Sequence, residues 1–201
     1  MSDYSPQGFR MLPTGVKNLL IVNAIMFFAY YVIGNTMHFN LNALLGIWPL
    51  DSGYFRIWQP VTYMFMHANL EHIFFNMFAL WMFGYVLENF WGTKRFLIYY
   101  FVCGIGAGLL TLLIPGGLTV GASGAVYGIP LAFGMTFPEE RIYLYFLMPI
   151  KAKWFVIGYA VIELLEGLFV TDGIAHFAHL GGMLFGLLLI LYWRRHPFNR
   201  Y

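Results

Sequence analysis

The sequence predicts an all-α membrane protein, a bundle of six transmembrane helices with a long interfacial loop between helices 1 and 2. Composition is the first reason: 60% of the residues are hydrophobic and 10% are charged, against about 25% charged in an ordinary soluble domain. The second is that apolar runs long enough to cross a bilayer, about 20 residues each, recur along the chain. The third is the distribution of basic residues, which fits an even number of spans.

Apolar runs between charged residues and turn residues mark the expected helices. They cover roughly residues 17–37, 67–88, 95–113, 123–136, 153–170 and 174–193. The run that follows Lys17 is too long for the apolar core of a signal peptide and has no obvious cleavage site, so we expect a retained span. We expect a single transmembrane domain over 16–195, with short cytoplasmic tails at 1–15 and 196–201.

The segment 38–66 is too rich in Asn, Pro, Gly and Trp to be a plain span. It holds Trp48, Tyr54, Trp58 and Tyr63, and such side chains favour the membrane–water boundary. This segment is the predicted interfacial loop.

Six spans place every basic residue except Arg56 on the side of the two termini. Those residues are Arg10, Lys17, Lys94, Arg95, Arg141, Lys151, Lys153, Arg194, Arg195 and Arg200. Because basic residues concentrate on the cytoplasmic side, both termini should be cytoplasmic. An odd number of spans would scatter these charges over both sides.

Composition also limits the function classes. A formal net charge of +2 gives no case for nucleic-acid binding, and the single cysteine, Cys103, excludes an intrachain disulfide. Small residues four apart predict close helix packing, which a channel, a transporter or an enzyme would need equally. These pairs are Gly104/Gly108, Gly124/Gly128 and Gly182/Gly186.

Four polar residues converge on one depth. The helix that begins at Ser123 is about 20 Å long, shorter than a hydrocarbon core of about 30 Å, so Ser123 lies below the outer face. His179 lies about 22 Å above the same cytoplasmic boundary, and His72 and Asn76 lie about 18–24 Å above it. The loop 114–120 must then dip into the membrane, which backbone tolerates where it lines a water-filled cavity.

These residue types fit acyl-transfer chemistry. A serine needs an adjacent base to become a nucleophile, and imidazole is the usual one. The oxyanion that forms needs fixed donors, for which His72, Asn76 and the Ser123 backbone N–H are candidates. Tyr127 shares the face of Ser123 and can pack on His179. We assign no carboxylate of the predicted helices that carry these residues to the site, so we expect a Ser–His dyad without an acid.

Three motifs in register resemble the rhomboid intramembrane serine proteases over roughly residues 15–195. They are His67-x4-His72-x3-Asn76, Gly121-x-Ser123-Gly124 with Tyr127, and Ala178-His179-x2-Gly182-x3-Gly186. The resemblance implies a rhomboid-like six-helix bundle. It also implies Ser123 as the nucleophile, His179 as the base, and His72 and Asn76 as oxyanion donors. It assigns His67 a structural hydrogen bond beneath the first loop.

The resemblance extends to Glu88, Trp91 and Gly92, at the end of the second predicted helix. It is incomplete in the predicted loop between helices 1 and 2. Trp58 matches the family's Trp-Arg pair, whereas the next residue is Gln59. Loop contacts that depend on arginine are therefore in question, and the catalytic assignment does not rest on them.

Glu163, Glu166 and His176 have no assigned role. A proton path, the lining of a water cavity or interhelical hydrogen bonds would each explain them. In the resembled family the fifth helix is the suspected lateral gate, so they would then tune its opening.

The expected function is intramembrane serine endopeptidase activity on single-span membrane proteins, with no cofactor and no metal. The expected location is the bacterial cytoplasmic (inner) membrane, with the site open to the outer face. Two alternatives stay open. One is a non-catalytic rhomboid-like protein that binds or escorts membrane clients. The other is a metal-dependent membrane enzyme or transporter that uses the histidines and the glutamates of the fifth helix.

Overall fold

The structure, a computed structural model, describes residues 10–113, 116–144, 147–169 and 176–196. The long helices are α1 (Thr14–Met37), α4 (Leu70–Trp91), α5 (Thr93–Thr111), α6 (Ser123–Thr136), α7 (Ala152–Phe169) and α8 (His176–Arg195). Each lies within a few residues of a predicted helix. The helix ends predicted at 170 and 174, and most of the two predicted tails, lie outside the described residues.

Within the described ranges, four helices are long and apolar enough to cross a membrane: α1, over Thr14–Gly34, and the whole of α4, α5 and α8. The two others are α6, with 14 residues, and α7, with 18 residues. The chain is thus a mostly helical protein with several candidate spans.

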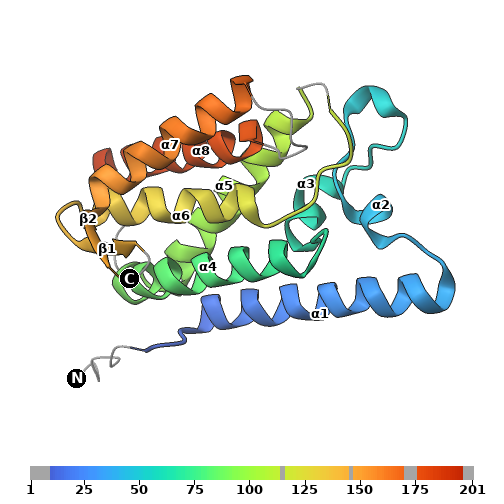
Figure 1. Cartoon of the computed structure of the whole chain (residues 1–201), viewed down its shortest axis with the longest axis horizontal. Coiled ribbons are helices and arrows are strands. Elements are labelled where there is room, and N and C mark those ends of the chain that lie inside the picture. The colour runs from blue at the N-terminus through green and yellow to red at the C-terminus, as the bar shows by residue number, and fades with distance from the viewer. Residues whose placement is uncertain (1–9, 114–115, 145–146, 170–175, 197–201) are drawn as a thin grey trace.

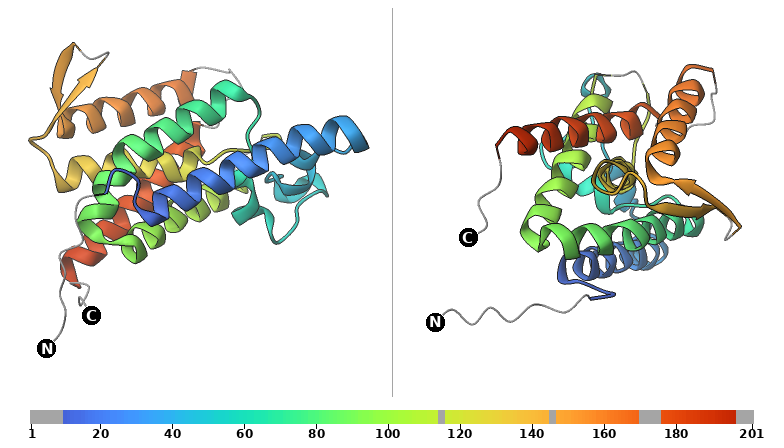
Figure 2. Two further views of the ribbon diagram at one scale, coloured as in Figure 1. Left: turned by 90° about the horizontal axis from the view of Figure 1, so that it is seen from below. Right: turned by 90° about the vertical axis from the view of Figure 1, so that its left-hand side faces the viewer.

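Helix α6 lies at the centre of the bundle. It packs against α4, α5, α7 and α8, and the end-on view shows it surrounded by the other helices (Figure 2, right). Helix α1 lies on the outside along α4 (Figure 1). Because α6 is enclosed, its small and apolar residues are buried, and its first residue is positioned by several neighbours at once.

Close contact between α6 and α8 depends on Gly182. A Cβ at Gly182 would lie 1.7 Å from the carbonyl oxygen of Gly124, a separation that no side chain can adopt. One turn further along α6, a Cβ at Gly128 would lie 3.4 Å from the carbonyl oxygen of Gly182. Small residues therefore bring the two backbones into contact, as the spacing predicts.

The glycine pair on α5 has a different neighbour. A Cβ at Gly104 would lie 2.1 Å from Met64, and one at Gly108 would lie 2.9 Å from Tyr63. Tyr63 also donates a hydrogen bond of 2.6 Å from its hydroxyl to the Gly104 carbonyl. Here the glycines accommodate the segment that leads into α4.

That segment, between α1 and α4, consists of short helices: α2 (Leu41–Leu45), η1 (Leu50–Ser52), α3 (Gln59–Thr62) and η2 (Tyr63–Phe65). The side chain of Gln59 organises it. Gln59 is 1% exposed, its Oε1 accepts from the backbone N–H groups of Trp48 and Arg56, and its Nε2 donates to the carbonyls of Leu44 and Tyr54. A neutral amide satisfies both donors and acceptors here, so glutamine has its own structural role at this position.

The last turn of α4 binds the first residues of α1 through hydrogen bonds. The buried carboxylate of Glu88 accepts hydrogen bonds of 2.7 Å from the backbone N–H groups of both Gly15 and Val16. Thr93 donates to the same carboxylate at 2.6 Å. An acidic group at a helix N-terminus pairs with unbonded N–H groups and with the helix dipole, so Glu88 fixes α1 against the bundle.

A β-hairpin, β1 (Arg141–Leu144) and β2 (Met148–Lys151), connects α6 to α7. No strand is among the elements expected from the sequence. Aromatic and β-branched residues such as Tyr143 and Ile150 favour strands, and they are the pattern that would have predicted it. Glu139, next to the hairpin, forms ion pairs with Lys151 and Lys153.

Candidate active site

A cavity of about 650 Å³ opens between α4, α6, α7 and α8. Its lining includes most of the residues that the sequence singled out. They are His72 and Asn76 from α4, Ser123 and Tyr127 from α6, and His179 from α8. Residues 118–120 form part of the wall, so the described part of the predicted dipping loop does border a polar cavity.

Ser123 and His179 are in hydrogen-bond contact. The Oγ of Ser123 lies 2.9 Å from Nε2 of His179, a good distance for proton transfer between a nucleophile and a base. Ser123 is the first residue of α6, and the close α6–α8 contact at Gly124 and Gly182 lies next to it. The packing that buries His179, which is 5% exposed, is thus also what brings the two side chains together.

Tyr127 holds the face of the imidazole. Its ring stacks on His179 with centroids 3.9 Å apart and planes 14° apart. On its other side Tyr159 of α7 stacks on Tyr127, with centroids 4.6 Å apart. The imidazole therefore has a rigid aromatic surface against one face, which limits its rotation.

The side chains of α4 face Ser123 across the cavity. A Cβ at Gly121 would lie 2.7 Å from His72 Nε2 and 3.5 Å from Ser123 Oγ, so the His72 ring reaches the backbone just before the serine. Gly121 has φ +134°, a conformation that favours glycine. The absence of a side chain there leaves space between the hydroxyl and the ring.

Hydrogen bonds to the backbone orient both α4 side chains. The Ala68 N–H donates to His72 Nδ1 at 3.4 Å, a long contact that leaves the ring hydrogen on Nε2, the atom nearest Gly121. Asn76 donates one amide hydrogen to the His72 carbonyl at 2.8 Å, and its second amide hydrogen remains for another acceptor. Two donors thus lie on the cavity side of α4.

The hydrogen bond predicted for His67 is not observed. The residue is fully buried, and neither ring nitrogen has a hydrogen-bond partner among the described residues. Its ring packs edge-to-face on His72, with centroids 5.0 Å apart. The hydrogen bond of His67 therefore stays a prediction, and what the structure shows is that His67 contacts the site through its ring, by packing behind His72.

The expectation that no acidic side chain contacts His179 was wrong. Glu163 of α7 places its Oε2 2.9 Å from Nδ1 of His179 and 2.9 Å from Nδ1 of His176. The prediction considered the helices that carry the serine, the histidine and the α4 residues, and those do not supply the acid. The pattern that marked Glu163 was an ionisable residue within an apolar helix, but its partner was not apparent from spacing.

The same three side chains are the one group in the described ranges that has a metal-ligand arrangement. Ligand atoms of Glu163, His176 and His179 lie within 4.8 Å of one another. His67 and His72 are not part of this group. The distances of 2.9 Å between the two imidazole nitrogens and the shared carboxylate oxygen are those of ordinary hydrogen bonds.

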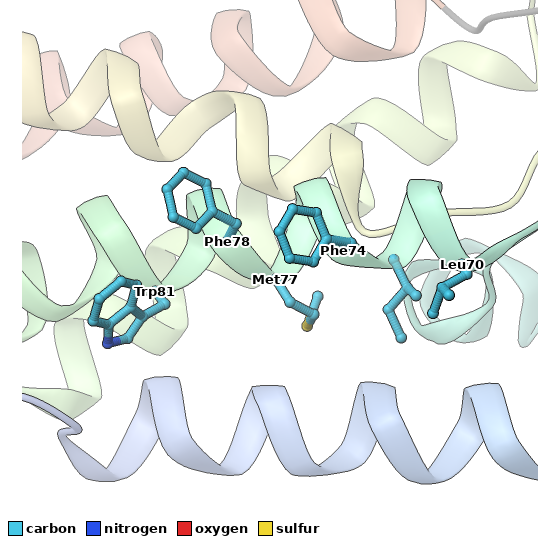
Figure 3. A pocket seen from close by; sticks show the side chains of 6 residues that line it. Leu70, Phe74, Met77, Phe78 and Trp81 are labelled. Atoms are coloured by element: carbon cyan, nitrogen blue, oxygen red, sulfur yellow. The ribbon is translucent and has the colours of Figure 1, made fainter. Parts of the chain in front are cut away.

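A second hollow, of about 300 Å³, lies on α4 and is wholly apolar. Leu70, Phe74, Met77, Phe78 and Trp81 line it (Figure 3). It holds no nucleophile, base or charged group, so the chemistry belongs to the cavity that contains Ser123.

Comparison with known families decides the classification. The family model for the Rhomboid domain matches residues 54–196, well over half of the chain. This chain belongs to the rhomboid family. The matched region contains Ser123 of α6, His179 of α8, and His72 and Asn76 of α4.

Several rhomboid proteins are similar to it. Rhomboid protease GlpG of Serratia proteamaculans is 31% identical over 211 residues, which cover 97% of this chain and 70% of the relative. Rhomboid protease GlpG of Photorhabdus laumondii is 32% identical over 158 residues, 76% of this chain and 53% of the relative. Rhomboid-like protease 3 of Toxoplasma gondii is 32% identical over 142 residues, 70% of this chain and 53% of the relative. The aligned part of this rhomboid chain thus spans about half the length of the last two.

Proposed function

We propose that this rhomboid chain is an intramembrane serine endopeptidase that hydrolyses peptide bonds in or near the transmembrane segments of other membrane proteins. The contact of 2.9 Å between Ser123 Oγ and His179 Nε2, within a cavity, carries the proposal. The names of the similar proteins, rhomboid proteases, support the same reaction class.

In the proposed reaction His179 and Ser123 form a catalytic dyad. His179 Nε2 removes the Ser123 hydroxyl proton while Oγ attacks the carbonyl carbon of the substrate. The imidazolium then gives this proton to the departing amine, and an acyl-enzyme remains. Water that enters through the open cavity, activated by the same imidazole, hydrolyses the acyl-enzyme and regenerates the serine.

The oxyanion of the tetrahedral intermediate would be stabilised from α4 and from the start of α6. His72 Nε2–H and Asn76 Nδ2–H face it from one side. The Ser123 backbone N–H faces it from the other, because the first N–H groups of a helix have no partner within the helix. Fixed donors of this kind act on charge that develops in the transition state.

In the bilayer we propose six transmembrane helices, with α6 and α7 joining the four candidate spans, and the segment 38–66 at the outer interface. Residues 16–195 would form one transmembrane domain between short tails at 1–15 and 196–201, both cytoplasmic because the basic residues concentrate on that side. The protein would then reside in a bacterial cytoplasmic (inner) membrane, with the cavity open to the outer face.

The proposed substrates are single-span membrane proteins, whose scissile peptide must leave its helical conformation to reach Ser123. Helical amides are shielded by their own hydrogen bonds, so small or helix-breaking residues near the cut would lower the cost of unwinding. The proposed mechanism uses neither a metal nor a cofactor.

The test is cleavage in liposomes that contain the purified protein and a single-span substrate. The wild type should cut the substrate, Ser123→Ala and His179→Ala should not, and a chelator should change nothing. Cleavage that survives Ser123→Ala would refute the serine mechanism. Loss of wild-type cleavage on chelation, restored by Zn²⁺, would favour a metal enzyme that uses Glu163, His176 and His179.

A further inference from the structure

Three side chains from three helices form a continuous hydrogen-bonded series. Ser123 Oγ of α6 contacts His179 Nε2 of α8 at 2.9 Å, and His179 Nδ1 contacts Glu163 Oε2 of α7 at 2.9 Å. Both ring nitrogens of the base therefore have a partner. We propose that Glu163 is the positioning residue of this site, acting on Ser123 through His179. This inference rests on the proposed function and adds a residue to its dyad.

The carboxylate selects the tautomer of His179. An ionised carboxylate accepts hydrogen bonds and cannot donate one, so Nδ1 of His179 must carry the hydrogen in this contact. In the neutral ring Nε2 then has a lone pair directed at Ser123 Oγ. That is the tautomer able to take the serine proton, whereas the other tautomer presents an N–H to the hydroxyl and cannot act as a base.

The carboxylate also stabilises the charge that forms during the reaction. When His179 accepts the serine proton it becomes a cation in a buried position, where an unpaired charge is unfavourable. Glu163, 3% exposed, supplies the opposite charge in direct contact. The stabilisation is larger in the transition state than in the resting enzyme, so it should appear in kcat more than in KM.

His176 keeps the carboxylate in place. Its Nδ1 lies 2.9 Å from the same Oε2 of Glu163 and 3.6 Å from Oε2 of Glu166. An oxygen that accepts from two imidazoles has a fixed direction, and α7 is thereby tied to α8 next to the site. The other titratable side chains that line the cavity with His179 are Tyr127 of α6, Tyr159 of α7, and Glu71 and His72 of α4.

Glu163→Gln is the decisive variant because it keeps size and removes charge. Its amide can donate to Nδ1 and so favour the tautomer that cannot serve as a base. We expect kcat to fall by at least about 10²-fold, as for the loss of a general-base function, with KM nearly unchanged. We also expect Glu163→Asp to retain more activity than Glu163→Gln.

The split between kcat and KM, together with the comparison with Glu163→Asp, separates positioning from a merely structural role. A positioned carboxylate acts on the transition state, so its loss in Glu163→Gln should lower kcat with KM nearly unchanged, and a carboxylate on a shorter side chain should restore part of kcat. The matched control is Glu140→Gln, an exposed glutamate beside the β1–β2 hairpin, which should stay within about threefold of the wild type, as is usual for a group outside the reacting site.

The experiment measures kcat, KM and the thermal unfolding temperature of these variants in liposomes or detergent. An active wild type, an inactive Ser123→Ala, and a Glu163→Gln with kcat within threefold of the wild type would overturn the role of Glu163 while leaving the proposed function intact. Loss of activity that follows a lowered unfolding temperature, with Glu163→Asp no better than Glu163→Gln, would also overturn it. Cleavage by Ser123→Ala would instead refute the proposed function itself.

Discussion

Serine is common in packed membrane helices, so the residue type alone does not mark a site. What distinguishes Ser123 is the set of side chains around it. Its Oγ lies 2.9 Å from an imidazole that is held on its far edge by Glu163 and on its face by Tyr127. A ring restrained in two directions keeps its lone pair aimed at the hydroxyl. The serine hydroxyl therefore lies beside an imidazole with a fixed orientation, which a serine used only for packing would not need.

Asn76→Ala tests the oxyanion donors. Removing the amide removes one hydrogen-bond donor to the developing negative charge, so kcat should fall by about 10²–10³-fold, with little change in KM. Steady-state cleavage of a transmembrane substrate in detergent measures both constants.

The control for Asn76 is Asn89→Ala on the same helix. Asn89 hydrogen-bonds to the backbone of Arg10 and Tyr85 at the opposite end of α4, so its loss should leave kcat within about threefold, as for a change outside the reacting site. Equal losses in the two variants would show that α4 is merely disturbed.

Among the elements, α6 and α8 determine the geometry of the site, because their contact sets the distance between the Ser123 hydroxyl and the His179 imidazole. The contact is backbone to backbone at Gly124 and Gly182. Any increase in separation there is transmitted to Ser123 and His179, which lie one and three residues away along the chain.

Gly182→Ala should therefore destabilise the protein and reduce its activity. The new Cβ would lie 1.7 Å from the Gly124 carbonyl oxygen, and forcing a side chain into a packed contact costs about 1–3 kcal/mol. Thermal unfolding in detergent measures the loss. Gly158→Ala on α7 is the control, since nothing lies within 4 Å of its Cβ, and it should unfold at or slightly above the wild-type temperature.

The ion pairs of Glu139 lie beside the hairpin that precedes α7, which we propose is outside the bilayer, and they can be tested by titration. Lys151 and Lys153 beside Glu139 hold the pKa of its carboxyl at about 2, below the ordinary 4.5. Because the pKa is lowered in the folded state, the ion pairs stabilise the hairpin fully above pH 4.5 and are lost as the pH falls toward 2.

Replacing both lysines by glutamine should return the pKa of Glu139 toward its ordinary value, as followed by carbon-13 NMR of labelled glutamate. The double variant Lys17→Gln/Lys94→Gln, at positions far along the chain, serves as the charge-matched control and should not move it. A Glu139 that titrates identically in all three proteins would contradict the ion-pair assignment.

For the whole molecule, the apolar runs predicted where the long helices lie, because length and hydrophobicity are local properties of the chain. The motif residues on three of these helices line one cavity, since depth along a helix follows from a fixed rise per residue. Ser123 and His179 were thus paired from sequence without any knowledge of side-chain contacts.

The contacts that the sequence did not predict depend on how each helix is rotated about its axis and on which segments pack next to it. The apposition of Glu163 and His179 requires knowing which face of α7 meets α8, and the helix period alone does not give that. The packing of His67 on His72 depends on how the segment before α4 turns. The Gln59 network likewise joins backbone groups from several turns of one loop.

Membrane orientation gives a prediction for the whole molecule. In a Cys103→Ser background, Asp51→Cys should react with a membrane-impermeant maleimide in intact spheroplasts, and Glu140→Cys should react only after lysis. Both residues are exposed, and the basic residues near Glu140 favour the cytoplasmic side. Labelling of Glu140→Cys before lysis would reverse the proposed topology.

Activation of Ser123 as a nucleophile by His179 is best tested by covalent labelling with a fluorophosphonate and mass spectrometry of the modified peptide. We expect one adduct, on Ser123, that is absent in Ser123→Ala and strongly reduced in His179→Ala, while chelation leaves it unchanged. An adduct on another residue, or undiminished labelling of Ser123→Ala, would contradict this activation.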